Sequence, residues 1–227
     1  MHPSKPFQVA GAASLVIGSL AVLVQYLVTP LSGQMKPAEI VEKAVRHHHA
    51  LGWALALDVP AMLVIPAVLF VGYLAGSRTS TFAGVATALC LVPAIGGVVL
   101  FANDAVVFEA AKLSDRAAAT AMVDGYANNA MIGGVTLVYL LSHLVGFPML
   151  AFALRRTAAV PVWVAVALGL WPFLEMAGYA ADTKAVAAVA YTLLAVGYVM
   201  CAVSLVRSTG SVDPVPVRDA VGHNQPV

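Results

Sequence analysis

The chain has 227 residues, of which 61% are hydrophobic and only 10% are charged, and its formal net charge at pH 7 is +1. Soluble domains average about 45–50% apolar and about 25% charged residues, so the composition excludes an ordinary soluble domain and indicates an integral membrane protein. The small net charge argues against a nucleic-acid partner and against a polybasic module that binds a membrane surface.

Six long apolar segments follow one another along the chain, each close to the roughly 20 residues that a bilayer requires. They are continuously apolar rather than alternating, which predicts helices rather than barrel strands. The polar, Pro-rich tail, residues 207–227, is predicted to be disordered. The sequence therefore predicts an all-α, polytopic membrane helix bundle within residues 1–206, with transmembrane helices at residues 7–30, 49–76, 82–108, 130–154, 160–181 and 185–206.

Two of the connections between these segments are long. The first carries charged residues at helical spacing between Glu39 and Arg46, which predicts an interfacial helix leading into the second span. The second predicts another short helix, capped by Ser114 and interrupted at Gly125.

The even number of spans places both termini on one face of the membrane. Basic residues are divided evenly between the two faces, but those on the terminal face, Arg78, Arg155, Arg156 and Arg207, lie close to span ends. The orientation rule gives most weight to such residues. We therefore expect a multi-pass protein of the cell membrane, with the lipid bilayer as its first partner and with cytoplasmic termini.

Three carboxylates, Asp58, Asp104 and Glu175, lie inside separate apolar segments. A charged side chain near a bilayer centre costs about 2.5–3.5 kcal/mol on insertion scales, so such residues are usually paired, cavity-facing and functional. Because successive helices run in opposite directions and rise about 1.5 Å per residue, all three acids fall in one leaflet, roughly 6–14 Å below the surface. That leaflet lies under the two long connections.

Further polar and aromatic side chains share helical faces with these acids or lie at the same side of the membrane. The sequence predicts a one-sided pocket under the long connections, with Asp58, Glu175, Asp104 and His143 as catalytic residues. The predicted substrate-binding residues are Trp171, Tyr179, Tyr139, Asn103 and His47. Structural alternatives stay open: an ion pair or interhelical hydrogen bond for Asp58 and Glu175, an end anchor for Asp104, and a satisfied core position for His143.

No cofactor and no metal are predicted. His47, His48 and His49 point about 100° apart on a helix, so no more than two of them could share a metal ion, and a surface cluster is the alternative. A membrane haem needs two facing histidines at similar depth, whereas His143 is central and the other three lie at a span edge.

Three short segments carry a resemblance: the histidines His47–His49 before the second span, Val59–Ala61 within it, and Asp115–Ala119 before the fourth span. With these the chain resembles a group of uncharacterised bacterial six-helix integral membrane proteins. The resemblance implies the six-helix fold and no activity.

The favoured hypothesis is a membrane-embedded enzyme of lyase, isomerase or cyclase type that acts on a lipophilic small molecule. One protonated acid would donate a proton while a second carboxylate or His143 accepts one, and the rings of Trp171, Tyr139 and Tyr179 would stabilise a carbocation. One alternative is an accessory or lipid-binding membrane protein, with a protein partner or as a homo-oligomer. The other alternative is a small proton-coupled transporter. Apart from His143, the cytoplasmic halves of the spans carry no ionisable residue, which argues against a pathway across the membrane.

Overall fold

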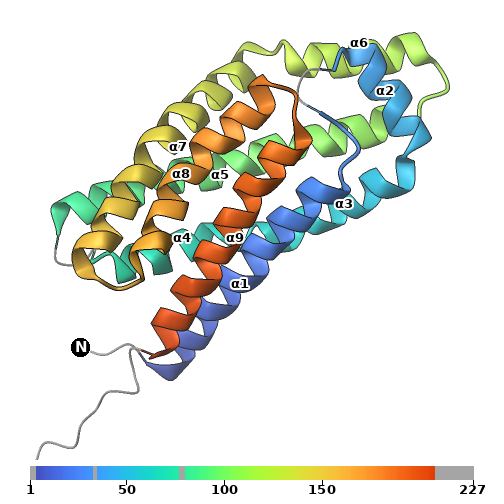
Figure 1. The fold of residues 1–227 in the computed structure, drawn as a ribbon. Coiled ribbons are helices and arrows are strands. Elements are labelled where there is room, and N and C mark those ends of the chain that lie inside the picture. The colour runs from blue at the N-terminus through green and yellow to red at the C-terminus, as the bar shows by residue number, and fades with distance from the viewer. Residues whose placement is uncertain (1–3, 33–34, 77–79, 208–227) are drawn as a thin grey trace, which may run out of the picture.

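The computed structural model describes residues 4–32, 35–76 and 80–207. Every regular element in these ranges is an α-helix, in agreement with the predicted all-α class. Of the predicted disordered tail, only Arg207 lies within the described residues, where it ends the last helix. The helices are α1 (Lys5–Val28), α2 (Pro37–Arg46), α3 (His48–Ala61), α4 (Val64–Leu74), α5 (Thr81–Ala110), α6 (Arg116–Ala127), α7 (Ala130–Thr157), α8 (Val162–Ala180) and α9 (Lys184–Arg207) (Figure 1).

Five helices, α1, α5, α7, α8 and α9, are each long and apolar enough to cross a membrane. The pair α3 and α4 meets the same criteria when it is counted as one span, bent by 40° at a short break. All six units end within three residues of the predicted bounds.

The break between α3 and α4 lies at Met62 and Leu63. Pro60 has no N–H group for an intrahelical hydrogen bond and its ring crowds the preceding turn, which weakens a helix at that point. The amide of Leu63 bonds to the carbonyl of Pro60 and that of Ile65 to the carbonyl of Met62, three residues back in both cases. Pro66 then falls in the first turn of α4, where a missing N–H costs nothing.

The six units form a closed ring. Helix α1 contacts α9, α9 contacts α8, α8 contacts α7, α7 contacts α5, and α5 contacts both α3 and α4, which return to α1. Small residues let the helices approach one another closely: Gly18 of α1 faces the backbone of Val64 at the start of α4, and Gly178 of α8 faces the backbone of Ala187 in α9.

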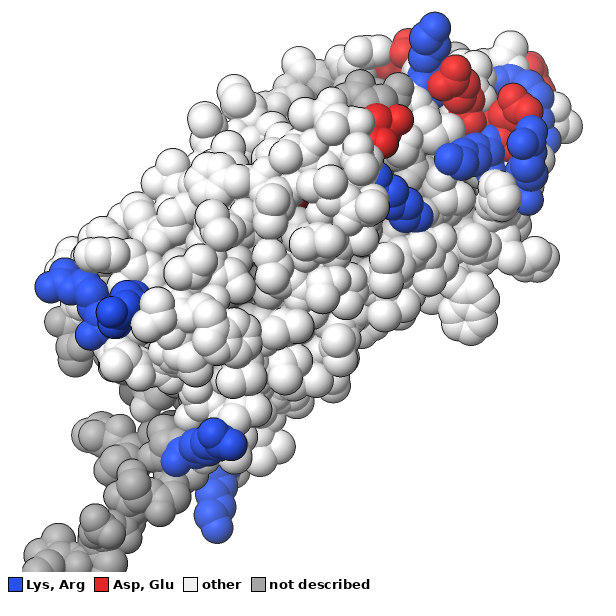
Figure 2. Space-filling model, viewed as in Figure 1, with Lys and Arg blue, Asp and Glu red and all other residues white. Residues whose placement is uncertain are grey.

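Large apolar side chains cover the outside of the ring. Trp53 and Val59 are each 68% exposed, and exposed Val, Leu, Ile and Phe side chains occur along all the long helices. Figure 2 shows the visible face as white over its middle, with charged residues at the two ends. An exposed apolar surface of this extent is typical of proteins that contact a membrane or another protein there.

Helices α2 and α6 close one end of the bundle, together with the neighbouring ends of α3 and α5 (Figure 1). Their small separate core includes Val41, Leu51, Val107 and Val123. The predicted helix between Glu39 and Arg46 therefore exists, and its apolar side is buried against other helices.

Two details predicted for the second connection are wrong. The N-cap of α6 is Asp115 rather than Ser114, because the Asp115 carboxylate accepts hydrogen bonds from the amides of Ala117 and Ala118. Gly125 does not interrupt the helix, which continues to Ala127. A single glycine costs a helix only about 1 kcal/mol, which the surrounding contacts can offset.

Candidate functional site

A cavity of about 610 Å³ lies inside the ring, in the half that faces α2 and α6. All six spans contribute to its walls, and Met62 at the break between α3 and α4 is among the lining residues. The cavity reaches Leu31 and Ser32 after α1 and residues 182–184 between α8 and α9. The cavity therefore reaches the surface of the protein at this end of the bundle, beside the exposed residues 182–184.

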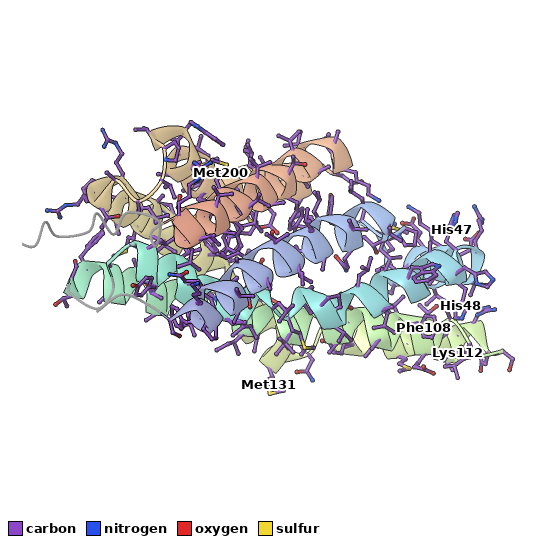
Figure 3. The ribbon with its side chains drawn as sticks, turned by 90° about the horizontal axis from the view of Figure 1, so that it is seen from below. His47, His48, Phe108, Lys112, Met131 and Met200 are labelled. Carbon is purple, nitrogen blue, oxygen red and sulfur yellow. The ribbon has the colours of Figure 1, made fainter. Side chains whose placement is uncertain are left out.

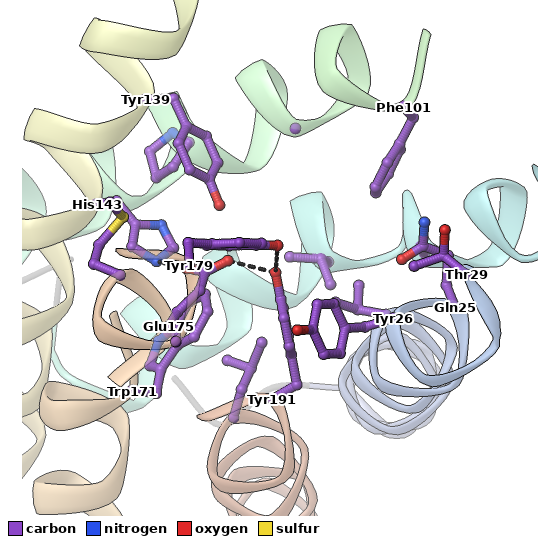
Figure 4. A pocket seen from close by; sticks show the side chains of 18 of the residues that line it. Gln25, Tyr26, Thr29, Phe101, Tyr139, His143, Trp171, Glu175, Tyr179 and Tyr191 are labelled. Carbon is purple, nitrogen blue, oxygen red and sulfur yellow. Dashed lines mark hydrogen bonds and ion pairs between the residues drawn. The ribbon is translucent and has the colours of Figure 1, made fainter. Parts of the chain in front are cut away.

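Glu175 of α8 is the centre of a hydrogen-bonded group at the wall of this cavity. The side chain is 2% exposed, and its Oε2 atom lies 2.9 Å from Nε2 of His143 in α7. The hydroxyl of Tyr191 in α9 donates to Oε1 of Glu175, and the hydroxyls of Tyr191 and Tyr179 are 3.1 Å apart (Figure 4). Side chains from three helices thus meet at one carboxylate.

Helical spacing explains why these side chains meet. Trp171, Glu175 and Tyr179 recur every four residues along α8 and so share one face. The same spacing places Tyr139 and Phe147 one turn before and one turn after His143 on α7.

Aromatic rings enclose His143. Its ring centroid is 5.0 Å from that of Tyr139, 5.2 Å from that of Phe147 and 4.3 Å from that of Trp171. Ring contacts of this kind fix the orientation of an imidazole. The imidazole is therefore packed among three aromatic rings.

Two buried nitrogen atoms at the cavity lack a partner. Nδ1 of His143 and Nε1 of Trp171 form no hydrogen bond with the residues that the structure describes. Burying a polar group without a partner costs free energy, so such groups call for an explanation. Both residues line the cavity, although these two nitrogen atoms are themselves buried.

Asp104 of α5 lines another part of the cavity, beside Asn103. Its Oδ2 atom accepts a hydrogen bond of 2.9 Å from the amide of Gln25 in α1. Outside the spans, burial and, to a lesser degree, the charge of Asp104 raise the pKa of Tyr126 in α6. Asp104 thus lies within electrostatic reach of the helix that closes this end.

Asp58 does not line the cavity. It is 3% exposed in α3, and neither of its carboxyl oxygens has a hydrogen-bond partner among the described residues. Asp104 is close enough to act on it electrostatically. The structure therefore places Asp104 in the cavity wall, whereas Asp58 is buried in α3 and does not line the cavity.

His47 lies apart from the cavity, between α2 and α3 at the end of the bundle (Figure 3). The next residue, His48, stacks on Phe108 with ring centroids 4.3 Å apart. The ammonium of Lys112 also lies over the Phe108 ring. Within the described ranges, no three His, Cys, Asp or Glu side chains are grouped in a way that could hold a metal ion.

Seven of the nine predicted site residues line the cavity: Asp104, Glu175, His143, Trp171, Tyr179, Tyr139 and Asn103. The sequence prediction overlooked Tyr191, Tyr26 and Gln25. The signal that could have found them is depth, because a polar or hydroxyl-bearing residue that lies level with Glu175 in a neighbouring span is able to reach the same cavity.

Comparisons of the chain with protein-family models, with curated proteins and with solved structures give no match.

Proposed function

We propose that the protein is a multi-pass membrane enzyme that binds a lipophilic molecule in its cavity and carries out acid–base chemistry on it through Glu175 and His143. The observation that carries this proposal is the buried Glu175–His143–Tyr191 group at the wall of a cavity with largely apolar and aromatic surroundings. Buried ionisable residues that face a cavity within apolar helices are most often functional.

The size of the cavity supports a small-molecule ligand. Binding sites for small molecules occupy about 300–1,000 Å³ and are lined mainly by apolar and aromatic side chains with a few polar groups. A volume of about 610 Å³ falls within this range. The apolar outer surface of the bundle supports insertion in a bilayer, in which such a ligand would dissolve.

The geometry suits a reaction that moves protons and needs no second substrate. Nε2 of His143 and Oε2 of Glu175 are 2.9 Å apart, which is within reach of proton transfer once the two groups are aligned on a ligand. In an isomerisation or cyclisation, one of the two groups would take a proton from one carbon of the ligand while the other returns a proton elsewhere. The pair then ends with the number of protons with which it began.

Solvent deuterium provides the test. The protein in nanodiscs is incubated in D₂O with the total lipid extract of its source cells, and mass spectrometry follows deuterium uptake into lipophilic compounds. We expect one compound class to gain deuterium with the wild-type protein. Glu175→Gln and His143→Gln should each lower the rate by about a hundredfold or more, the usual contribution of a general acid or base.

Glu109→Gln serves as the matched control, because it also exchanges a carboxylate for an amide but lies exposed near the end of α5. Full exchange by Glu175→Gln would refute the catalytic role of the carboxylate. A lipophilic compound that co-purifies with the protein and never gains deuterium would instead identify a lipid-binding protein.

A further inference from the structure

The charges around the cavity are unbalanced. Three acids line it, Asp104, Glu175 and Asp182, whereas Lys184 is the one lining Lys or Arg among the described residues. The ammonium of Lys184 is already engaged at the rim, where it donates to the carbonyls of Leu27 at 3.1 Å and Thr29 at 2.7 Å. An anionic ligand would therefore meet several acids and no free cation.

Aromatic rings add to the negative potential. Rings from five of the six spans line the cavity, and Figure 4 shows how they surround the central space: Tyr26, Phe101, Tyr139, Trp171, Tyr179 and Tyr191. The face of an aromatic ring carries negative electrostatic potential and attracts cations within about 6 Å of its centroid. Lys184 already illustrates this contact, since its Nζ lies 5.8 Å from the centroid of the Tyr26 ring.

Asp104 has capacity for a cationic partner. One carboxyl oxygen accepts from Gln25, and no second bond to Asp104 is formed by the described residues. Asp58 of α3 interacts electrostatically with Asp104, is 3% exposed, and has no hydrogen-bond partner for either carboxyl oxygen among the described residues. Two neighbouring acids without a basic partner repel each other, and a positive charge beside Asp104 would offset that repulsion.

We infer that the ligand of this cavity is a lipophilic cation, such as a substituted ammonium, with its charge beside Asp104 and its apolar body among the rings that lead to Glu175. The inference rests on the proposed function in that the cavity must be a binding site, but it does not require turnover. A neutral lipid would leave Asp58 and Asp104 uncompensated, and an anion would add to the imbalance.

Two ions of the same shape and opposite charge test the inference. The full chain has three tryptophans, of which Trp53 and Trp163 are exposed and Trp171 lines the cavity. The double variant Trp53→Phe/Trp163→Phe leaves Trp171 as the fluorescent reporter. In detergent micelles, tetraphenylphosphonium should change the Trp171 emission in a saturable manner, whereas tetraphenylborate should not.

The Asp104→Asn substitution in that background should weaken tetraphenylphosphonium binding by about tenfold or more, the effect of removing one close charge–charge contact. Asp104→Glu, which keeps the charge, should retain the preference for the cation, and Glu109→Gln should leave the affinity unchanged. Partition of the ions into the micelle is the same for all variants.

Equal or tighter binding of tetraphenylborate would overturn the inference, as would an unchanged affinity for the cation in Asp104→Asn. If neutral triphenylphosphine oxide bound as tightly as the cation, the ligand would be recognised by apolar contacts alone. Failure of the catalytic proposal is recognised separately, by deuterium exchange that does not depend on Glu175.

Discussion

At the scale of single residues, the site depends on hydroxyl groups as much as on carboxylates. Helix α9 supplies two buried tyrosines, Tyr191 and Tyr198, which both line the cavity. Tyr191 donates to Glu175, whereas the hydroxyl of Tyr198 has no hydrogen-bond partner in the described part of the chain. The two tyrosines of this helix thus differ in whether their hydroxyl groups are hydrogen-bonded.

This difference predicts opposite results for two matched substitutions. Tyr191→Phe removes a hydrogen bond to a buried acid and should lower the free energy of unfolding by about 1.5–3 kcal/mol, the range for bonds to charged groups. Tyr198→Phe removes an unpaired buried hydroxyl and should leave stability unchanged or raise it slightly. Unfolding midpoints in mixed micelles of a mild detergent and dodecyl sulfate would measure both, and equal losses would contradict the assigned bond.

The sequence predicts how deep in the bundle a side chain lies, but it does not always predict which way that side chain points around its helix. Asp104, Glu175 and His143 could be assigned to one cavity because span boundaries fix how deep they lie. The position of Asp58 could not, because α3 is apolar on all sides and gives no sign of which face turns inward. Tyr191 was overlooked because a tyrosine disturbs an apolar pattern much less than an acid does.

At the scale of helices, small residues set the distances between neighbours. A Cβ atom placed on Gly18 of α1 would lie 2.7 Å from the backbone nitrogen of Val64, beside the break between α3 and α4. Backbone atoms cannot move aside as the end of a side chain can. The position of α1 against α4 therefore depends on the absence of a side chain at Gly18.

Gly18→Ala should consequently destabilise the bundle by about 1–3 kcal/mol through overpacking. Gly134→Ala in α7 is the control, since a Cβ there meets no atom within 4 Å, and it should gain about 0.5–1 kcal/mol because alanine is the better helix former. The same unfolding measurement applies. Two variants that both gain stability would show that α1 and α4 are not in close contact.

The limits of the helices could be predicted because a bilayer-length apolar run is a strong signal that tertiary contacts do not override. The cap at Asp115 and the continuation of α6 through Gly125 could not be predicted. Each depends on a difference of about 1 kcal/mol in helix stability between alternative residues or helix ends. The break at Met62 and Leu63 directly follows Val59–Ala61, where Pro60 marks a weak point of the span in the sequence, but the bend of 40° depends on tertiary contacts.

At the scale of the whole molecule, the two ends of the bundle differ in charge. The end at which α1 begins and α9 finishes carries Lys5, Arg155, Arg156 and Arg207. Figure 2 shows blue side chains and no red ones at that end. The exposed acids of the described ranges all lie toward the opposite end, on α2 and α6, at the end of α5, and in the connections before α6 and between α8 and α9: Glu39, Glu42, Glu109, Asp115, Asp124 and Asp182. The cavity opens at this mixed end, so the orientation of the bundle decides from which side a ligand enters.

Basic residues beside span ends are retained in the cytoplasm, which predicts that the termini are cytoplasmic and that the cavity opens on the outer side. Two substitutions that leave the charge unchanged test this orientation, Ser4→Cys beside α1 and Ala121→Cys on α6, both at exposed positions. The native Cys90 and Cys201 are fully buried and should give little background. A membrane-impermeant maleimide applied to intact cells should label Ala121→Cys and spare Ser4→Cys, and permeabilised cells should show both labelled. The reverse labelling pattern would show the opposite orientation in the membrane, in which a ligand would have to reach the cavity from the cytoplasm.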